Sequence, residues 1–109
     1  MSEESVGPSD IQIYKHGGGY RVRPATFAAG RGTHVRFFNA GPDAVRLIFP
    51  DEIFAGVGVG PVDIGVGSTQ QLTVKSDIGL GAYPYAVYVM SVARDFARGD
   101  SAPIIIIDR

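Results

Sequence analysis

The sequence predicts an all-β fold, a β-sandwich of about eight strands with at most one short helical turn. Fifteen glycines and seven prolines divide the 109 residues into short segments. Turn residues at such intervals are typical of strands joined by tight turns. β-Branched and aromatic residues fill most of these segments, as strands prefer. Two packed sheets are the simplest way to bury this many half-apolar strands.

The expected elements follow from local alternation of apolar and polar residues. Strands are expected at Ile11–Lys15 and Tyr20–Arg23, with Gly17–Gly19 as a turn between them. Ala28–Gly32 is typical of a second turn, and Thr33–Asn39 is expected to follow it as a strand with Val35 and Phe37 facing inward. The other expected strands are Val45–Phe49, Val62–Ile64, Thr69–Lys75, Tyr83–Met90 and Pro103–Asp108. Ser91–Gly99 is the one segment that suits a helical turn.

Length and composition predict one domain and exclude several kinds of chemistry. A chain of 109 residues is too short for two independent cores. We expect residues 1–10 to form a flexible polar N-terminus and residues 11–109 to form the domain. Without cysteine, the chain has no disulfide, thiolate nucleophile or cysteine-bound metal.

Charge and the N-terminal residues bear on partners and location. Ten scattered basic residues and a net charge of −1 predict no nucleic-acid binding. No apolar run is long enough to span a membrane, so we expect no membrane insertion. The acidic, polar start is unlike a signal peptide, which predicts a cytoplasmic protein. If a leader preceded this chain, the expected location is periplasmic or secreted.

No arrangement of residues indicates catalysis, so we expect a protein that is not an enzyme and has no catalytic residues. Nucleophile elbows and metal-protease motifs are missing from the sequence. Carboxylates mostly fall in turns, where aspartate is favoured for local hydrogen bonds. They are Asp43, Asp51, Glu52, Asp63, Asp77 and Asp95.

The chain has two histidines, His16 and His34, and these are its only imidazole groups that could bind a metal. His16 adjoins a glycine-rich turn, and alternation along Thr33–Asn39 directs His34 outward. We expect both imidazoles to be exposed and unligated, and we expect no metal and no cofactor. The alternative is a non-blue copper or zinc site, which requires His16 and His34 to converge with a carboxylate.

Three segments together resemble the cupredoxin family, whose members include plastocyanin and azurin. Pro24–Asn39 is similar to the family's glycine-containing turn followed by a Val-x-Phe-x-Asn strand. The turn and strand after Asn39 match next, and Gly81–Val87 then precedes a loop and a terminal strand. The resemblance covers most of the chain from Ile11 to Asp108 and implies a Greek-key sandwich.

The copper ligands that the resemblance implies are missing. The family's first histidine falls near Val45, and its cysteine falls at Val87. The loop before the last strand, residues 91–103, contains neither histidine nor methionine. A blue copper site depends on its thiolate, so we expect no copper-based electron transfer.

An apolar outer sheet face is the most informative functional signal. If Tyr83, Tyr85, Val87 and Val89 face inward, then the alternate residues of Tyr83–Met90 form an apolar row facing outward. One isoleucine pair of the last strand must also face outward. The predicted interface consists of Ile48, Ala86, Tyr88, Met90, Ile105 and Ile107. Exposed apolar surface of this kind favours association, so we expect a homo-oligomer or a complex with another protein.

Two other interpretations remain open at this stage. The segment Ser91–Gly99 could cover the apolar face within one chain by means of Val92 and Phe96. Alternatively, the loop end of the sandwich around Val45, Tyr85 and Val87 could form a pocket for a small enzyme or a ligand carrier.

Overall fold

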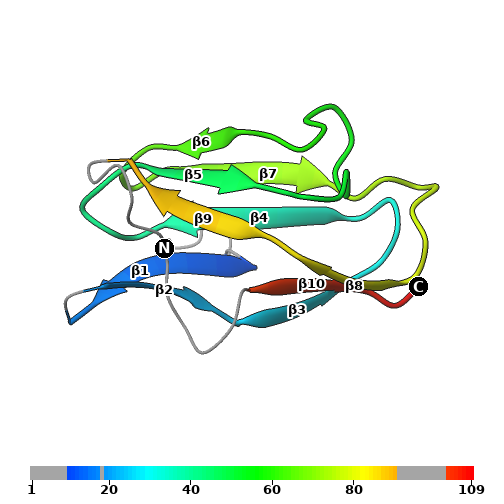
Figure 1. The fold of residues 1–109 in the computed structure, drawn as a ribbon, viewed down its shortest axis with the longest axis horizontal. Helices are drawn as coiled ribbons and strands as arrows, with labels where there is room; N and C mark the ends of the chain where they lie inside the picture. The colour runs from blue at the N-terminus through cyan, green and yellow to red at the C-terminus, as the bar shows by residue number, and fades with distance from the viewer. Residues whose placement is uncertain (1–9, 18, 91–102) are drawn as a thin grey trace, which may run out of the picture.

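The computed structural model describes residues 10–17, 19–90 and 103–109, and every regular element among them is a strand (Figure 1). In chain order the strands are β1 (Ile11–His16), β2 (Gly19–Arg23), β3 (Thr26–Ala29), β4 (His34–Asn39), β5 (Val45–Ile48), β6 (Val62–Ile64), β7 (Thr69–Thr73), β8 (Gly81–Pro84), β9 (Ala86–Val89) and β10 (Ile104–Ile107). The helical turn predicted at residues 91–99 lies outside the described residues. The described part of the chain contains no helix able to cross a membrane.

The first sheet has the strand order β2-β1-β4-β7. β1 is antiparallel to β2 and parallel to β4, with Ile11 opposite Phe37 and Ile13 opposite Asn39. β4 is antiparallel to β7, with Val35 opposite Leu72. The inward residues of these strands are buried, as the alternation predicted for Val35 and Phe37.

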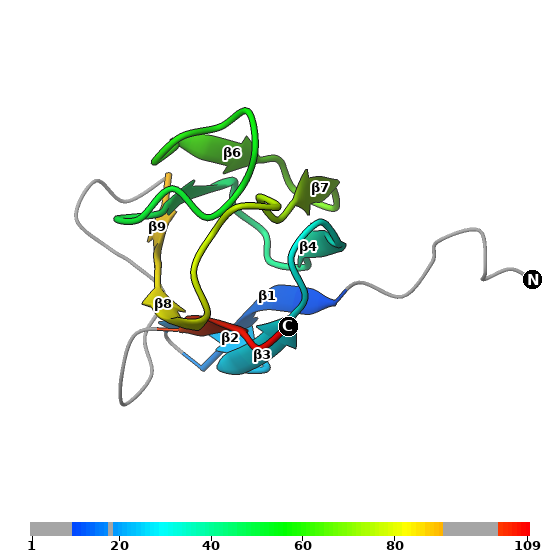
Figure 2. The same cartoon turned by 90° about the vertical axis from the view of Figure 1, so that its right-hand side faces the viewer.

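The second layer is held together by one long strand. β8 and β9 correspond to the predicted strand Tyr83–Met90, but β8 begins earlier, at Gly81, and the strand is interrupted at Tyr85. β9 pairs with β5, which pairs with β6, and β8 pairs with β10, which pairs with β3. At the interruption the Tyr85 N–H donates to the Pro103 carbonyl at 3.0 Å. Figure 2 shows β8 and β9 on one side of the molecule and β4 and β7 on the other.

Strand β3 differs from the prediction. The sequence favoured a turn over Ala28–Gly32, but Ala28 and Ala29 lie in β3, paired with Ile106 and Ile107 of β10. Only the remainder is a turn, with Gly32 at φ +77°. Alanine has weak intrinsic strand preference, and pairing with a distant strand overrides it here. β3 and the interruption at Tyr85 account for the described strands exceeding the predicted eight.

Four aromatic rings form the centre of the core. The Phe37 ring meets those of Phe49, Phe54 and Tyr85 edge to face, at centroid distances of 6.2, 5.9 and 5.9 Å. All four side chains are 2% exposed or less. Such pairs add to the free energy gained from burial alone. Val45, Leu47 and Phe49, at alternate positions of the predicted strand Val45–Phe49, are also buried.

Asn39 organises the turn between the two layers. It is fully buried, and its side-chain Nδ2 donates to the carbonyls of Asp43 at 2.8 Å and Ile64 at 3.0 Å. Its Oδ1 accepts from the Gly41 N–H at 3.0 Å. A buried polar side chain is tolerated when its bonding groups are satisfied in this way. Asn39 therefore fixes where β4 ends and β5 begins.

Tyr20 of β2 also holds the turn between β4 and β5, through hydrogen bonds to Asp43. Its hydroxyl donates to Asp43 Oδ2 at 2.7 Å and accepts from the Asp43 N–H at 2.9 Å. Burial and the bond to Asp43 raise the pKa of Tyr20 to about 12. Gly41 packs against this ring so closely that a Cβ there would lie 2.3 Å from Tyr20 Cε2. The turn therefore requires glycine at position 41.

Replacing Tyr85 with phenylalanine is expected to leave stability near pH 7 unchanged or raised by up to about 1 kcal/mol. Tyr85 is 2% exposed, and its hydroxyl has no hydrogen-bond partner among the described residues. Burial raises the pKa of this phenol. The folded state thus keeps the proton that the unfolded state loses above about pH 10. Stability of the unmodified chain should therefore fall above about pH 10, and less so in Tyr85→Phe.

Urea unfolding of both proteins, near pH 7 and above pH 10, measures this difference. A loss of well over about 1 kcal/mol in Tyr85→Phe near neutral pH would show that the hydroxyl has a buried partner.

Candidate interaction surface

The outer side of the second layer carries mainly apolar side chains that are neighbours across strands. Ile48 of β5 lies opposite Ala86 of β9. Ile104 of β10 lies opposite Pro84 of β8, and Ile106 lies opposite Ala82. We call the outer side chains of these strands, together with Met90 directly after β9, the apolar face. It consists of Ile48, Ala82, Pro84, Ala86, Tyr88, Met90, Ile104 and Ile106.

The last strand corrects the predicted interface. Ile105 and Ile107 are 0% and 1% exposed and belong to the core, so the prediction that they face outward is wrong. Ile104 and Ile106 are half-buried on the outer side. Ile105 pairs with Tyr83, which packs against the core, and this register fixes the orientation of the whole strand. The segment Ile104–Ile107 contains no polar residue, so alternation in the sequence could not show which isoleucine pair faces outward.

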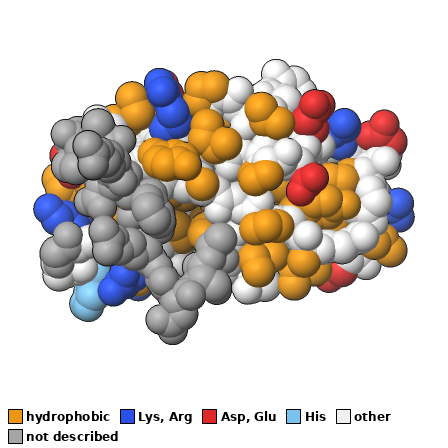
Figure 3. Space-filling model, viewed as in Figure 1, with side chains coloured by type: hydrophobic (Ala, Val, Ile, Leu, Met, Phe, Trp, Pro, Cys, Tyr) orange, Lys and Arg blue, Asp and Glu red, His pale blue; other side chains and the backbone are white. Residues whose placement is uncertain are grey.

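The other predicted interface residues do point outward. Tyr88 and Met90 are 41% and 44% exposed, whereas Ile48 and Ala86 are half-buried. Figure 3 shows hydrophobic side chains across the middle of this face, in the part that grey residues leave visible. Their role in an interface stays a prediction.

One ion pair borders the apolar face. Arg46 lies opposite Tyr88 in β9 and opposite Asp63 in β6. Its Nε and Nη2 donate to Asp63 Oδ1 and Oδ2 at 2.7 and 3.0 Å. This bidentate contact raises the pKa of Arg46 and lowers that of Asp63. Both groups are exposed, so the pair adds little stability but keeps both charges at neutral pH.

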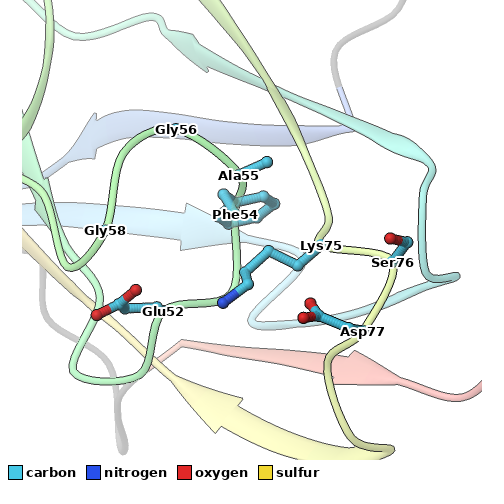
Figure 4. Close-up of a pocket in the computed structure, with 8 residues that line it drawn as sticks. All are labelled: Glu52, Phe54, Ala55, Gly56, Gly58, Lys75, Ser76 and Asp77. Atoms are coloured by element: carbon cyan, nitrogen blue, oxygen red, sulfur yellow. The ribbon is translucent and has the colours of Figure 1, made fainter.

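A cavity of about 400 Å³ lies beyond the end of β5, between the loop that follows this strand and the residues after β7. Its walls are Glu52, Phe54, Ala55, Gly56, Gly58, Lys75, Ser76 and Asp77. Figure 4 shows Lys75 extending between Glu52 and Asp77. Sequence reasoning missed this cavity, because an isolated bridge between Phe54 and Val74 brings its two segments together.

The predicted pocket around Val45, Tyr85 and Val87 is wrong. These side chains are 0%, 2% and 1% exposed and form part of the core. Val45 begins β5, whereas the cavity adjoins the loop after that strand. Apolar side chains at these three positions fill the interior of the sandwich instead of lining an opening.

The two histidines do not converge. Both are exposed, and His34 Nδ1 lies 2.9 Å from Thr73 Oγ1. β1 and β4 run parallel with Ile13 opposite Asn39. His16 comes three residues after Ile13 and His34 comes five residues before Asn39, so the two lie eight residues apart along the strand direction. At ~3.3 Å per residue this separates them by about 26 Å. A metal site that uses both histidines is therefore excluded. Among the described residues, no group of three or more His, Asp or Glu side chains is placed to hold a metal ion.

Comparisons with known proteins identify the fold. No protein-family model matches the sequence, and no curated protein matches it. Among solved structures, the purple cupredoxin from Nitrosopumilus maritimus matches with a TM-score of 0.58 and 13% identity. The match covers 93% of this chain and all of that one. The chain has the cupredoxin fold. The predicted fold class, a Greek-key β-sandwich of the cupredoxin type, is thereby confirmed.

A blue copper centre does not fit this cupredoxin-like chain. The resemblance implies ligands at Val45 and Val87, and both side chains are buried hydrocarbon in the core. The chain has no cysteine to supply the thiolate on which such a centre depends.

Proposed function

We propose that this protein is a non-enzymatic assembly module that forms a homodimer through its apolar face. The observation that carries this proposal is the apolar outer side of a sheet where a solvated face would be polar. The six strands of this layer carry only two charged residues, Arg46 and Asp63, and these pair with each other. Contiguous exposed apolar surface in a small protein usually marks an interaction site.

A second copy suits this face because its charge pattern is self-complementary. In a two-fold dimer the same patch meets itself, with residue pairs repeated in reverse. Arg46 and Asp63 carry opposite charges on neighbouring strands, so the pair of one copy can exchange partners with that of the other. The net charge of −1 also produces little repulsion between copies.

The size of the face predicts weak association. The apolar face lies on four strands, β5, β8, β9 and β10, each four residues long. With strands ~4.8 Å apart and ~3.3 Å per residue, these cover roughly 250 Å². Two copies would bury roughly 500 Å², in the range of weak, transient contacts. The dimer should therefore dissociate on dilution.

Substitution of Ile106 with lysine is expected to shift the chain from dimer to monomer. Ile106 is half-buried at the outer side of β10, so a long side chain there can extend into solvent without disturbing the core. A lysine would place two like charges across a two-fold interface, which weakens pairing by roughly tenfold or more. Sedimentation equilibrium over a concentration series measures the change.

Val66→Lys is the matched control, because Val66 is 58% exposed and lies in the loop after β6. It should dimerise like the unmodified chain. If both variants and the unmodified chain are monomers at every concentration, the proposal fails, and coverage of the face by residues 91–99 becomes the favoured interpretation.

A further inference from the structure

The outer side of the first sheet differs from the apolar face in its charge. Strands β1, β2, β4 and β7 together carry four cationic residues and no acidic one. Arg21, Arg23 and Arg36 lie on the outer side, because their neighbours in sequence Tyr20, Val22, Val35 and Phe37 face or pack against the core. We call this surface the cationic face. It gathers three guanidinium groups in a protein whose net charge is −1.

Two of these arginines are held in the same way by a glutamine on the adjacent strand. Arg23 lies opposite Gln12, and its Nε donates to Gln12 Oε1 at 2.9 Å. Arg36 lies opposite Gln71, and its Nε donates to Gln71 Oε1 at 3.1 Å. Each guanidinium is thus oriented through its Nε by a neutral partner. Within the described residues, the terminal amino groups of Arg23 and Arg36 donate no hydrogen bond to the protein.

A ring contact holds Arg23 further. Its guanidinium carbon lies 4.3 Å from the centre of the Tyr14 ring, a cation–π contact. Ordering a long side chain before binding reduces the entropy that a ligand must overcome. The terminal amino groups of an arginine match the two oxygens of a carboxylate. Arg23 and Arg36 are therefore prepared to bind oxyanions.

The spacing of these arginines fits an extended peptide. Arg23 and Phe38 both lie opposite Gln12, and Arg36 is two residues from Phe38. Two strand spacings and two residues separate the Cα atoms of Arg23 and Arg36 by about 12 Å. In an extended peptide, side chains four residues apart point the same way and lie about 13 Å apart. Carboxylates at such positions can reach both arginines together.

We propose that the cationic face binds an extended acidic segment of a partner protein, with carboxylates at alternate positions. Arg23 and Arg36 each receive one carboxylate, and Arg21, two residues before Arg23 on the edge strand β2, adds positive charge beside them. Asp10, the residue before β1, accepts a hydrogen bond from the Arg36 backbone N–H at 2.9 Å. Its negative charge repels further anionic groups, so this face can accept only a few anionic contacts. Nucleic-acid binding proteins commonly neutralise more phosphates than three arginines can contact.

Binding of a labelled peptide that alternates glutamate with threonine tests this proposal, with fluorescence anisotropy as the readout. The unmodified chain should bind the peptide, and binding should weaken as salt increases. The double variant Arg23→Gln, Arg36→Gln should weaken binding about tenfold or more, because two charge-assisted contacts are lost. Gln12→Ala keeps both charges and should weaken binding by a smaller factor, since only the orientation of Arg23 is lost.

Arg46→Gln is the matched control, because Arg46 lies on the other layer and should not affect binding. Circular dichroism verifies that each variant is folded. The proposal is overturned if the chain does not bind the peptide, or if a glutamine-threonine peptide binds equally well. It is also overturned if Arg46→Gln weakens binding as much as the double variant. Tighter binding of an oligothymidylate of equal charge would assign the face to nucleic acid instead.

Discussion

Replacing Phe37 with alanine is expected to destabilise the fold by about 3–5 kcal/mol. The side chain is fully buried, and its ring contacts Phe49, Phe54 and Tyr85 from three directions. Alanine would remove the buried area and leave a cavity among rings that cannot close around it. Because these rings come from both layers, the loss weakens the contact that holds the sandwich together.

Phe38→Ala is the control for this effect. Phe38 is the next residue of β4 and is half-buried on the outer side. Its replacement should cost about 1 kcal/mol or less, because no cavity forms at a solvated face. Urea unfolding of the two variants and the unmodified chain gives both values. Equal losses at the two positions would contradict the assignment of inward and outward faces along β4.

Replacing Asn39 with aspartate is expected to cost about 3–5 kcal/mol at neutral pH. Asparagine at this position donates to two carbonyl oxygens, those of Asp43 and Ile64. An ionised aspartate would face the same carbonyls with no proton to donate, as a buried charge without a partner. Its folded-state pKa would be raised, so the variant should lose stability as pH rises above the ordinary aspartate pKa of about 4.

Asn39→Ala separates the charge from the lost hydrogen bonds. It should cost about 2–3 kcal/mol, because buried donors and acceptors of the turn lose their partners, and this loss should not depend on pH between about 4 and 7. Thermal unfolding at both ends of this range measures the difference. A loss in Asn39→Asp that does not change with pH would contradict the buried position of this side chain.

Local alternation predicted the inner and outer sides of the strands where apolar and polar residues differ clearly. The inward set Val45, Leu47 and Phe49 follows from period-two alternation, because Arg46 marks the opposite side of the strand. The same rule gave no answer for Ile104–Ile107, because either pair fits either side. The register with β8 and β3 decides it, and that register depends on residues far away in the sequence.

The features that the sequence did not predict arise from pairing between distant strands. The Arg36–Gln71 contact requires β4 and β7 to be neighbours, and the Arg23–Tyr14 stack requires the register of β1 with β2. In the linear sequence the basic residues are scattered, which hid the cationic face. The cavity beside Lys75 depends in the same way on the bridge between Phe54 and Val74. Composition gives the charges, but only topology places them together.

The two sheets therefore present outer sides of different chemistry. One side is apolar and is proposed to bind a second copy, and the other is cationic and is proposed to bind an acidic segment. The two layers carry these surfaces independently, so each can be altered without the other. A dimer joined through the apolar faces would leave both cationic faces available, and two linked sites can bind a repeated partner more tightly than one.

The molar mass of the unmodified chain in solution, measured by light scattering over a concentration series, tests the central claim most directly. One chain has a mass of 11.6 kDa, so twice that mass, 23.2 kDa, is expected at high concentration, with a fall toward 11.6 kDa on dilution. A constant 11.6 kDa at every concentration would contradict self-association through the apolar face.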